Sequence, residues 1–233
     1  MTYTAFVPAR SGSKRLPHKN VKLLAGKPLV AWTLEACVGA SQVDTVILST
    51  DSEEYWDIAC EYVSSDKLVL DFRSSDEAGD KVKIFDYLKS SHEKIFSDRD
   101  GAFILALPTV PLRREDQIDA AIKMYEDVGA PVFSASPYGF SVSFAFQLAE
   151  ENGWEPLFED SPMLTGNTRS QDQKSTYHPN GAIYVRSISD LAKPGLKTLY
   201  DGAVPYVMDA NSSVDVDNDI DFSHAEAILR VTG

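Results

Sequence analysis

Apolar and polar residues alternate along the first two thirds of the chain in blocks that predict strands separated by helices. Short apolar runs recur, and most are followed by a segment with apolar residues at helical spacing. The predicted strands cover residues 5–9, 44–49, 67–71, 102–107 and 131–136. The predicted helices cover residues 28–37, about 53–63, 86–90 and 114–127. This alternation predicts an α/β fold with a parallel sheet and right-handed crossovers.

The pattern changes after residue 137. Segments 140–148 and 181–187 are typical of hairpin pieces, and a long polar stretch lies between them. Large apolar side chains are frequent here, at Phe140, Phe144, Phe146, Trp154 and Phe158. They either pack on their own domain or form an interface with a second subunit. We expect an α/β domain at 1–137 and 186–233, and a β-rich excursion at 138–185 that makes a homodimer contact.

The chain has 233 residues, of which 43% are hydrophobic and 24% charged, enough to bury a core in one folding unit. No apolar run approaches the roughly 20 residues that span a bilayer. The N-terminus lacks the basic and apolar regions of a secretory signal, so we expect a cytoplasmic protein without a membrane partner. Cys37 and Cys60 lack metal-site or redox spacing and are predicted to be buried thiols.

The formal net charge of −13 argues against nucleic acid as a partner, because nucleic-acid binding needs basic patches. A local cationic pocket can still hold a small anion on an acidic protein. The basic residues gather in residues 10–20, the basic loop, directly after the first predicted strand. A loop in this place is a standard ligand position in open α/β sheets.

The basic loop has the chemistry of an anion site. Gly12 allows backbone N–H groups to approach an anion, and Arg10, Lys14 and Lys19 supply positive charge. The alternative is a solvated basic loop. The spacing of a P-loop is absent. Further on, Asp51 and Glu54 have capping-box spacing, so Asp51 is predicted to cap the next helix rather than to bind a ligand.

A second candidate site lies near the C-terminus, in residues 214–217, the acidic segment. Asp215 and Asp217 alternate with valines, so both carboxylates point to one face of an extended chain. Two carboxylates on one face suit Mg²⁺, which takes substrate phosphates as further ligands. The alternative is an acidic solvated turn that leads into a helix.

The basic loop sequence, residues 7–20 (VPARSGSKRLPHKN), resembles the signature of the CMP-sialic acid synthetase, or acylneuraminate cytidylyltransferase, family. Further blocks resemble that family in the same order: PTVPLR at 108–113, RSQD at 169–172, YHPNGAIY at 177–184 and VDVD at 214–217. The resemblance implies a Rossmann-like, mostly parallel sheet with helices on both faces and a small dimerisation domain. It covers nearly the whole chain.

The resemblance also implies roles for individual residues. Nucleotide contacts are expected from Ala9, Arg10, Ser11, Gly12, Lys14, Lys19, Asn20, Arg73 and Asp80. Contacts with an acidic sugar are expected from Arg113, Arg169, Gln171, Tyr177 and Asn180, with Arg169 near the place of an arginine that reaches across the dimer. Mg²⁺ is expected on Asp215 and Asp217, and the catalytic residues are expected to be Arg10, Lys19 and Asp217.

Several positions depart from the family pattern. Leu107 stands where the family usually has a glutamine that touches the sugar, and Val110 replaces a serine. The segments 74–81 and 173–175 also differ. Most of these changes fall around the acceptor, so the identity of the sugar stays open among sialic, legionaminic and pseudaminic types. No general base is identified, and His178 is predicted to have a packing or surface role.

The expected reaction is the transfer of CMP from CTP to the anomeric hydroxyl of an acidic nine-carbon sugar, with release of pyrophosphate. Positioning and cationic stabilisation should provide most of the catalysis. Three alternatives remain: an eight-carbon keto-acid sugar as acceptor, a metal-dependent sugar transferase, and a catalytically impaired relative that only binds nucleotide or sugar.

Overall fold

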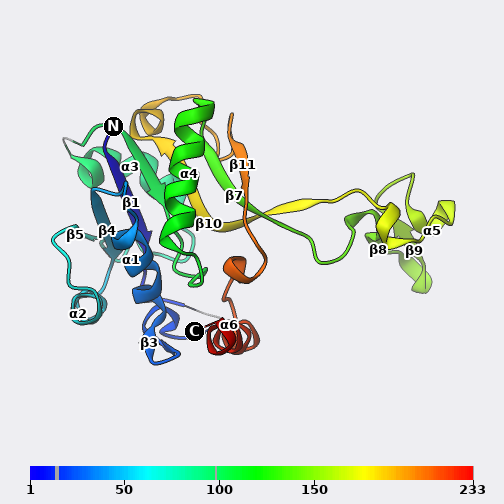
Figure 1. Cartoon of the computed structure of the whole chain (residues 1–233), viewed down its shortest axis with the longest axis horizontal. Helices are drawn as coiled ribbons and strands as arrows, with labels where there is room; N and C mark the ends of the chain where they lie inside the picture. Colours follow the sequence, from blue (N-terminus) through cyan, green and yellow to red (C-terminus); the bar gives the residue numbers. More distant parts are fainter. Residues whose placement is uncertain (14–15, 98, 233) are drawn as a thin grey trace.

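The computed structural model describes residues 1–13, 16–97 and 99–232, and in this part of the chain a seven-stranded sheet forms the centre (Figure 1). The strand order is β11-β7-β10-β6-β1-β4-β5. The strands are β1 (Tyr3–Pro8), β4 (Thr45–Thr50), β5 (Leu68–Phe72), β6 (Ala102–Leu105), β7 (Val132–Pro137), β10 (Tyr177–Ser187) and β11 (Val204–Val207). Strand β10 runs antiparallel to both of its neighbours, β6 and β7, and the other pairings are parallel. The predicted mostly parallel sheet is confirmed.

Helices cover both faces of the sheet because successive strand residues point to opposite sides. The longer helices are α1 (Leu29–Gly39), α2 (Glu53–Tyr62), α3 (Ile84–Phe96), α4 (Glu115–Val128) and α6 (Asp219–Thr232). In β1, Ala5 and Val7 pack toward α1 and α4, whereas Phe6 packs toward α3. The Phe6 ring lies 6.4 Å from that of Phe96, between ring centroids. Each buried large apolar side chain of this kind contributes about 1.5–3 kcal/mol to the free energy of unfolding.

A third apolar cluster packs helix α6 against the segment that follows β1. Phe222 and Ala225 of α6 pack with Leu16, Leu24 and Val216. Leu24 belongs to a short antiparallel pair, β2 (Leu23–Leu24) with β3 (Lys27–Pro28). This cluster brings the acidic segment next to the basic loop.

Two local predictions are wrong. Ser52, not Asp51, caps α2, because the Ser52 side chain accepts the N–H of Tyr55 at 3.3 Å. Asp51 instead accepts hydrogen bonds from the basic loop. Cys37 is buried as predicted, but Cys60 is exposed, because it lies on the solvent side of α2.

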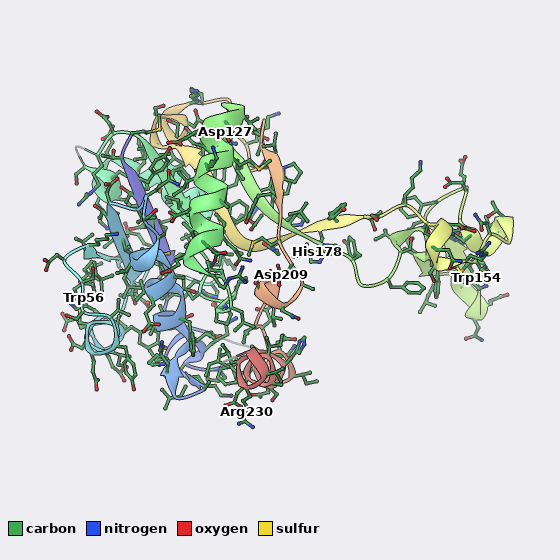
Figure 2. The ribbon with its side chains drawn as sticks, in the orientation of Figure 1. Trp56, Asp127, Trp154, His178, Asp209 and Arg230 are labelled. Atoms are coloured by element: carbon green, nitrogen blue, oxygen red, sulfur yellow. The ribbon has the colours of Figure 1, made fainter. Side chains whose placement is uncertain are left out.

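Residues 138–176 leave the sheet between β7 and β10 and form an arm that stands away from the body (Figure 1). The arm contains a small antiparallel pair, β8 (Phe146–Leu148) with β9 (Trp154–Pro156), and the short helix α5 (Pro162–Thr165). Figure 2 shows His178 at the root of the arm and Trp154 near its outer end. Residues 181–187, expected as a hairpin piece of the excursion, lie instead in the central sheet, because β10 pairs with both β6 and β7.

The α/β body of the chain does not bury the large apolar side chains of the arm. Phe140 is 69% exposed, Phe146 50% and Trp154 47%. They contact neighbours within the arm: Phe140 lies 5.2 Å from Phe144, and Phe146 lies 5.9 Å from Trp154, between ring centroids. The arm therefore presents an apolar surface to solvent.

Candidate active site

The basic loop starts at the carboxyl end of β1, in the centre of the sheet. Buried Ala9 continues the sheet pairing, because its N–H donates to the Ser49 carbonyl at 2.8 Å. Asn20, also buried, donates from Nδ2 to the Arg10 carbonyl at 2.9 Å. These contacts shape the loop from inside, so Ala9 and the Asn20 amide are turned toward protein rather than toward solvent.

The next residues of the loop show which donors remain for a ligand. Ser11 donates its N–H and its hydroxyl to Asp51. Gly12 is exposed, and no heavy atom within the described chain lies within 4 Å of the place where a Cβ would stand. Gly12 thus leaves an open approach to the backbone of the loop. Lys14, expected to contact nucleotide, lies outside the described residues.

Arg10, Arg73 and Asp80, three residues expected to contact the nucleotide, lie together in the structure. Arg10 Nη1 lies 2.8 Å from Asp80 Oδ1, and both side chains are about one third exposed, at 35% and 39%. Together with Arg73 they line a pocket of about 220 Å³. The other lining residues are Pro8, Val82, Ile84 and Tyr87.

Arg73 is a buried lining residue of this pocket, and a hydrogen bond to the main chain fixes its side chain. It is 4% exposed, and its Nη2 donates to the Ser49 carbonyl at 2.9 Å. Its guanidinium carbon lies 5.6 Å from the centroid of the Tyr87 ring. Burial lowers the pKa of Arg73, yet an arginine remains charged at neutral pH. Within the described residues, Arg73 Nε has no hydrogen-bond partner, which leaves one buried donor.

Sequence reasoning missed the residues that hold Arg73 in place. The Tyr87 hydroxyl donates to Asp71 Oδ2 at 2.8 Å, and the Ser49 hydroxyl donates to the same oxygen at 2.6 Å. Burial and the hydrogen bond to Asp71 raise the pKa of Tyr87, so it stays a neutral donor. These groups come from α3, β5 and β4, and no spacing in the sequence connects them.

The acidic segment lies against the basic loop. Lys19 Nζ donates to the Val216 carbonyl at 2.8 Å and to Asp217 Oδ1 at 3.1 Å. Val216 is fully buried, and its N–H donates to the Thr109 carbonyl at 2.7 Å. Because Val216 points into the core, Asp215 and Asp217 point to the other side. The structure thus joins two sites that lie 198 residues apart in the sequence.

The two carboxylates of the acidic segment repel each other. Enclosure by protein on one side raises the pKa of Asp215, and the neighbouring charges of Asp217 and Asp221 raise it further. A hydrogen bond from Thr109 and the charge of Lys19 act in the opposite direction. Asp215 is nevertheless exposed, so its oxygens are accessible from solvent. A cation between Asp215 and Asp217 would relieve the repulsion.

Two residues expected at the sugar are instead buried parts of the scaffold. Arg113 is 3% exposed and donates to Thr33 Oγ1 at 2.8 Å and to the Leu107 carbonyl. Asn180 is 6% exposed, and all its polar groups are used. It accepts from Ser134 Oγ and the Ala182 N–H, and donates to Ser136 Oγ and Ser213 Oγ. Asn180 therefore ties β7 and β10 to the turn that precedes the acidic segment.

The other residues expected at the sugar belong to the arm or to its root. Arg169 and Gln171 are exposed, and Arg169 Nε lies 3.8 Å from Asp172 Oδ2. Tyr177 begins β10 and is 51% exposed. The ring of His178 packs against that of Tyr138, 4.7 Å away between centroids, in agreement with a packing role. Because the arm stands away from the sheet, its segment 169–172 is separated from the basic loop of its own chain, whereas Tyr177 and His178 lie at the root of the arm, where β10 begins to pair with β7 (Figure 1).

No helix in the described part of the chain is long and apolar enough to cross a membrane. No group of three or more histidine, cysteine, aspartate or glutamate side chains there could hold a metal ion by itself.

Two solved structures share this fold. One is a CMP-2-keto-3-deoxy-manno-octonic acid synthetase complexed with CTP, with a TM-score of 0.69 and 15% identity over 99% of each chain. The other is the 4-diphosphocytidyl-2C-methyl-D-erythritol synthase of Anaerococcus prevotii, with a TM-score of 0.66 and 12% identity over 98% of this chain and 96% of that one. At these identities the likeness shows the fold alone.

The family follows from sequence. Residues 4–193 match the profile of the cytidylyltransferase family. The chain is 32% identical to the CMP-N,N′-diacetyllegionaminic acid synthase of Legionella pneumophila, over 99% of this chain and 97% of that protein. It is 33% identical to the N-acylneuraminate cytidylyltransferase of Escherichia coli, over 97% of this chain but 52% of that longer protein. It is 27% identical to the pseudaminic acid cytidylyltransferase of Campylobacter jejuni, over 99% and 97%. The chain belongs to the cytidylyltransferase family, and so to the transferase class of enzymes.

Proposed function

We propose that this enzyme transfers CMP from CTP to the anomeric hydroxyl of an acidic nine-carbon sugar and releases pyrophosphate. The observation that carries the proposal is the contact of Lys19 with Asp217, which puts a cationic loop and a pair of carboxylates side by side. A nucleoside triphosphate needs both: cations for its phosphates, and carboxylates for the metal ion that accompanies it.

The nucleotide would lie over the carboxyl ends of β1 and β4. The exposed backbone at Gly12 and the partly exposed Arg10 can approach phosphate oxygens. Lys19 uses two of its three N–H donors within the described residues, so the third can serve a phosphate. The pocket of Arg73 and Asp80 is lined by a guanidinium donor and a carboxylate acceptor, the pair of groups that can recognise the edge of a cytosine ring.

Asp215 and Asp217 fit a magnesium ion. Their mutual repulsion favours a cation, and carboxylate oxygens suit Mg²⁺, which completes its coordination with water and phosphate oxygens. When bound, the ion would neutralise charge on the triphosphate.

The chain's own residues supply positioning and charge. As the anomeric hydroxyl attacks the α-phosphorus and loses its proton to solvent, a new oxygen–phosphorus bond forms, the bond from that phosphorus to the bridging oxygen breaks, and negative charge grows on the departing pyrophosphate. Arg10 and Lys19 stabilise this charge because they are held by Asp80 and by the acidic segment before the substrate arrives.

We propose that the acidic sugar is held between two subunits of a homodimer. The arm presents exposed apolar side chains that need cover, and it carries Arg169, a cation suited to the sugar carboxylate. Because Arg169 is separated from the basic loop of its own chain, it would serve the site of the partner. Leu107, at the end of β6, offers no hydrogen bond to the acceptor.

The alternatives are less well supported. The solved synthetase for an eight-carbon sugar is 15% identical to this chain, whereas the relatives named for nine-carbon sugars are 27–33% identical. A sugar transferase or an inactive binding protein would not release pyrophosphate from CTP.

The decisive experiment incubates the enzyme with CTP, Mg²⁺ and a panel of acidic sugars, and measures pyrophosphate release. We expect release with at least one of the sialic, legionaminic and pseudaminic acids. Release only with the eight-carbon keto-acid would replace the proposed acceptor class. Binding of CTP in calorimetry without release for any sugar would indicate the inactive relative.

Replacing Arg10 with alanine should weaken CTP binding by about 1.5–3 kcal/mol, the usual cost of a lost charge-assisted hydrogen bond. That corresponds to roughly a 10- to 100-fold increase in the Kd, measured by calorimetry without sugar. The matched control is Lys123→Ala, which removes a cation from an exposed ion pair on α4. An Arg10→Ala variant that binds CTP as tightly as the Lys123→Ala control would rule out the phosphate role.

A further inference from the structure

Asp51 has no place in the proposed contacts with nucleotide, metal or sugar. It directly follows β4, at the carboxyl end of the sheet, and the N-cap of α2 is the next residue, Ser52. The Asp51 carboxylate therefore lies at the rim of a site built to bind an anion. A free carboxylate in this position would repel a triphosphate.

Both oxygens of this carboxylate are directed at one residue of the basic loop. Oδ1 accepts the N–H of Ser11 at 2.7 Å, and Oδ2 accepts the Ser11 hydroxyl at 2.9 Å. Hydrogen bonds to a charged acceptor are stronger than those between neutral groups. The negative charge is thus used to fix the loop in front of Gly12.

Tyr55 supports the same residue from the first turn of α2. Its hydroxyl lies 3.3 Å from the Ser11 carbonyl, to which it donates, and 3.3 Å from Nδ1 of His18. The Tyr55 side chain is 1% exposed, so its position is fixed by packing. The loop is therefore held on both sides of Ser11, by Asp51 at the N–H and by Tyr55 at the carbonyl.

We infer that Asp51 is a positioning residue that holds residues 10–13 in the shape that accepts the triphosphate. It acts through Ser11 and does not itself contact the nucleotide or a metal ion. The inference rests on the proposed function for the identity of the ligand, CTP. The role of Asp51 in loop structure does not depend on that identity.

The test compares three substitutions of Asp51. Asp51→Ala and the bulkier Asp51→Leu both remove the acceptors, and we expect each to raise the KM for CTP roughly 10-fold and to speed hydrogen exchange in residues 10–13. Asp51→Asn can keep both bonds: its carbonyl oxygen accepts the Ser11 N–H, and its amide donates to the Ser11 hydroxyl, which can act as acceptor. We expect Asp51→Asn to behave like the wild type in both measurements.

Asp44 provides a matched control at the other end of the same strand. It accepts the Tyr3 N–H at 2.8 Å, just before β4 begins. Asp44→Ala should lower the Tm by a similar amount to Asp51→Ala and leave the KM for CTP unchanged. An equal increase in KM for both alanine variants would reduce Asp51 to a general stability role and overturn the inference.

Two further outcomes would also overturn it. If Asp51→Asn raises the KM for CTP as much as Asp51→Ala but keeps the wild-type exchange rate in residues 10–13, the charge acts on the ligand and not through the loop. If neither Asp51→Ala nor Asp51→Leu changes exchange in residues 10–13, Asp51 does not hold the loop. If the wild type binds no CTP, the proposed function fails, and the exchange measurement still decides whether Asp51 fixes the loop.

Discussion

Replacing Asp217 with asparagine is expected to lower kcat roughly 100- to 1,000-fold, which corresponds to about 3–4 kcal/mol of lost transition-state stabilisation. Asparagine retains an oxygen for Lys19 but removes the charge that would hold a cation beside Asp215. The Asp217 side chain is 40% exposed, so the Tm should change little. Turnover is measured by pyrophosphate release across a titration of Mg²⁺.

A nearby carboxylate serves as the control for this substitution. Asp219 lies two residues further on, is 77% exposed and pairs with Lys22 at 2.7 Å. Asp219→Asn should leave kcat within about twofold of the wild type, as expected for an exposed ion pair. Wild-type turnover of the Asp217→Asn variant at every magnesium concentration would exclude the metal assignment.

At a CTP concentration near the wild-type KM, where the Arg10→Ala variant is poorly occupied, mixing it with an Arg169→Ala variant is expected to restore activity that neither variant shows alone. If the arm completes the partner's site, each mixed dimer has one site with both defects and one with neither. Random exchange of equal amounts of the two variants makes half of all dimers mixed. One of the two sites in each mixed dimer is intact, so about a quarter of wild-type activity should return. Pyrophosphate release is followed as the subunits exchange.

A second mixture controls for unspecific recovery. Arg10 and Asp217 both lie in the body of one chain, so Arg10→Ala mixed with Asp217→Asn leaves every site of a mixed dimer with one defect. This mixture should remain inactive. A monomer in sizing experiments, or no recovery with Arg169→Ala while labelled subunits demonstrably exchange, would disprove the shared site.

The sequence predicted the sheet well because its strands are buried on both faces and its helices are amphipathic. Segments such as 102–107 and 114–127 carry that pattern in consecutive residues. Of β10, only residues 181–187 were predicted, as a hairpin piece and not as part of the central sheet. The strand starts at the root of the arm with largely exposed residues and becomes buried from Asn180 onward, so its first residues have the pattern of a loop.

The candidate site was predictable where charge was concentrated in one short segment. The basic loop and the acidic segment were each visible as patterns, and the structure places them in contact. Burial was not predictable in the same way. Arg113 and Asn180 are polar residues in motif positions, and only the three-dimensional structure shows that neighbouring strands enclose them. The partners of Asp51 were hidden because Ser11 lies 40 residues away.

The contact of Lys19 with Asp217 also has a consequence for biosynthesis. Its two residues are separated by 198 positions, so the carboxylates leave the ribosome long after the loop that they face. Bringing together segments so far apart in the sequence costs chain entropy and slows folding. Local helices and strands therefore form before this contact. A nascent chain can therefore assemble most of its sheet while it still lacks Asp215, Asp217 and the helix that packs them against the loop. The contact between the two segments therefore forms only after residues 214–217 and α6 have been synthesised.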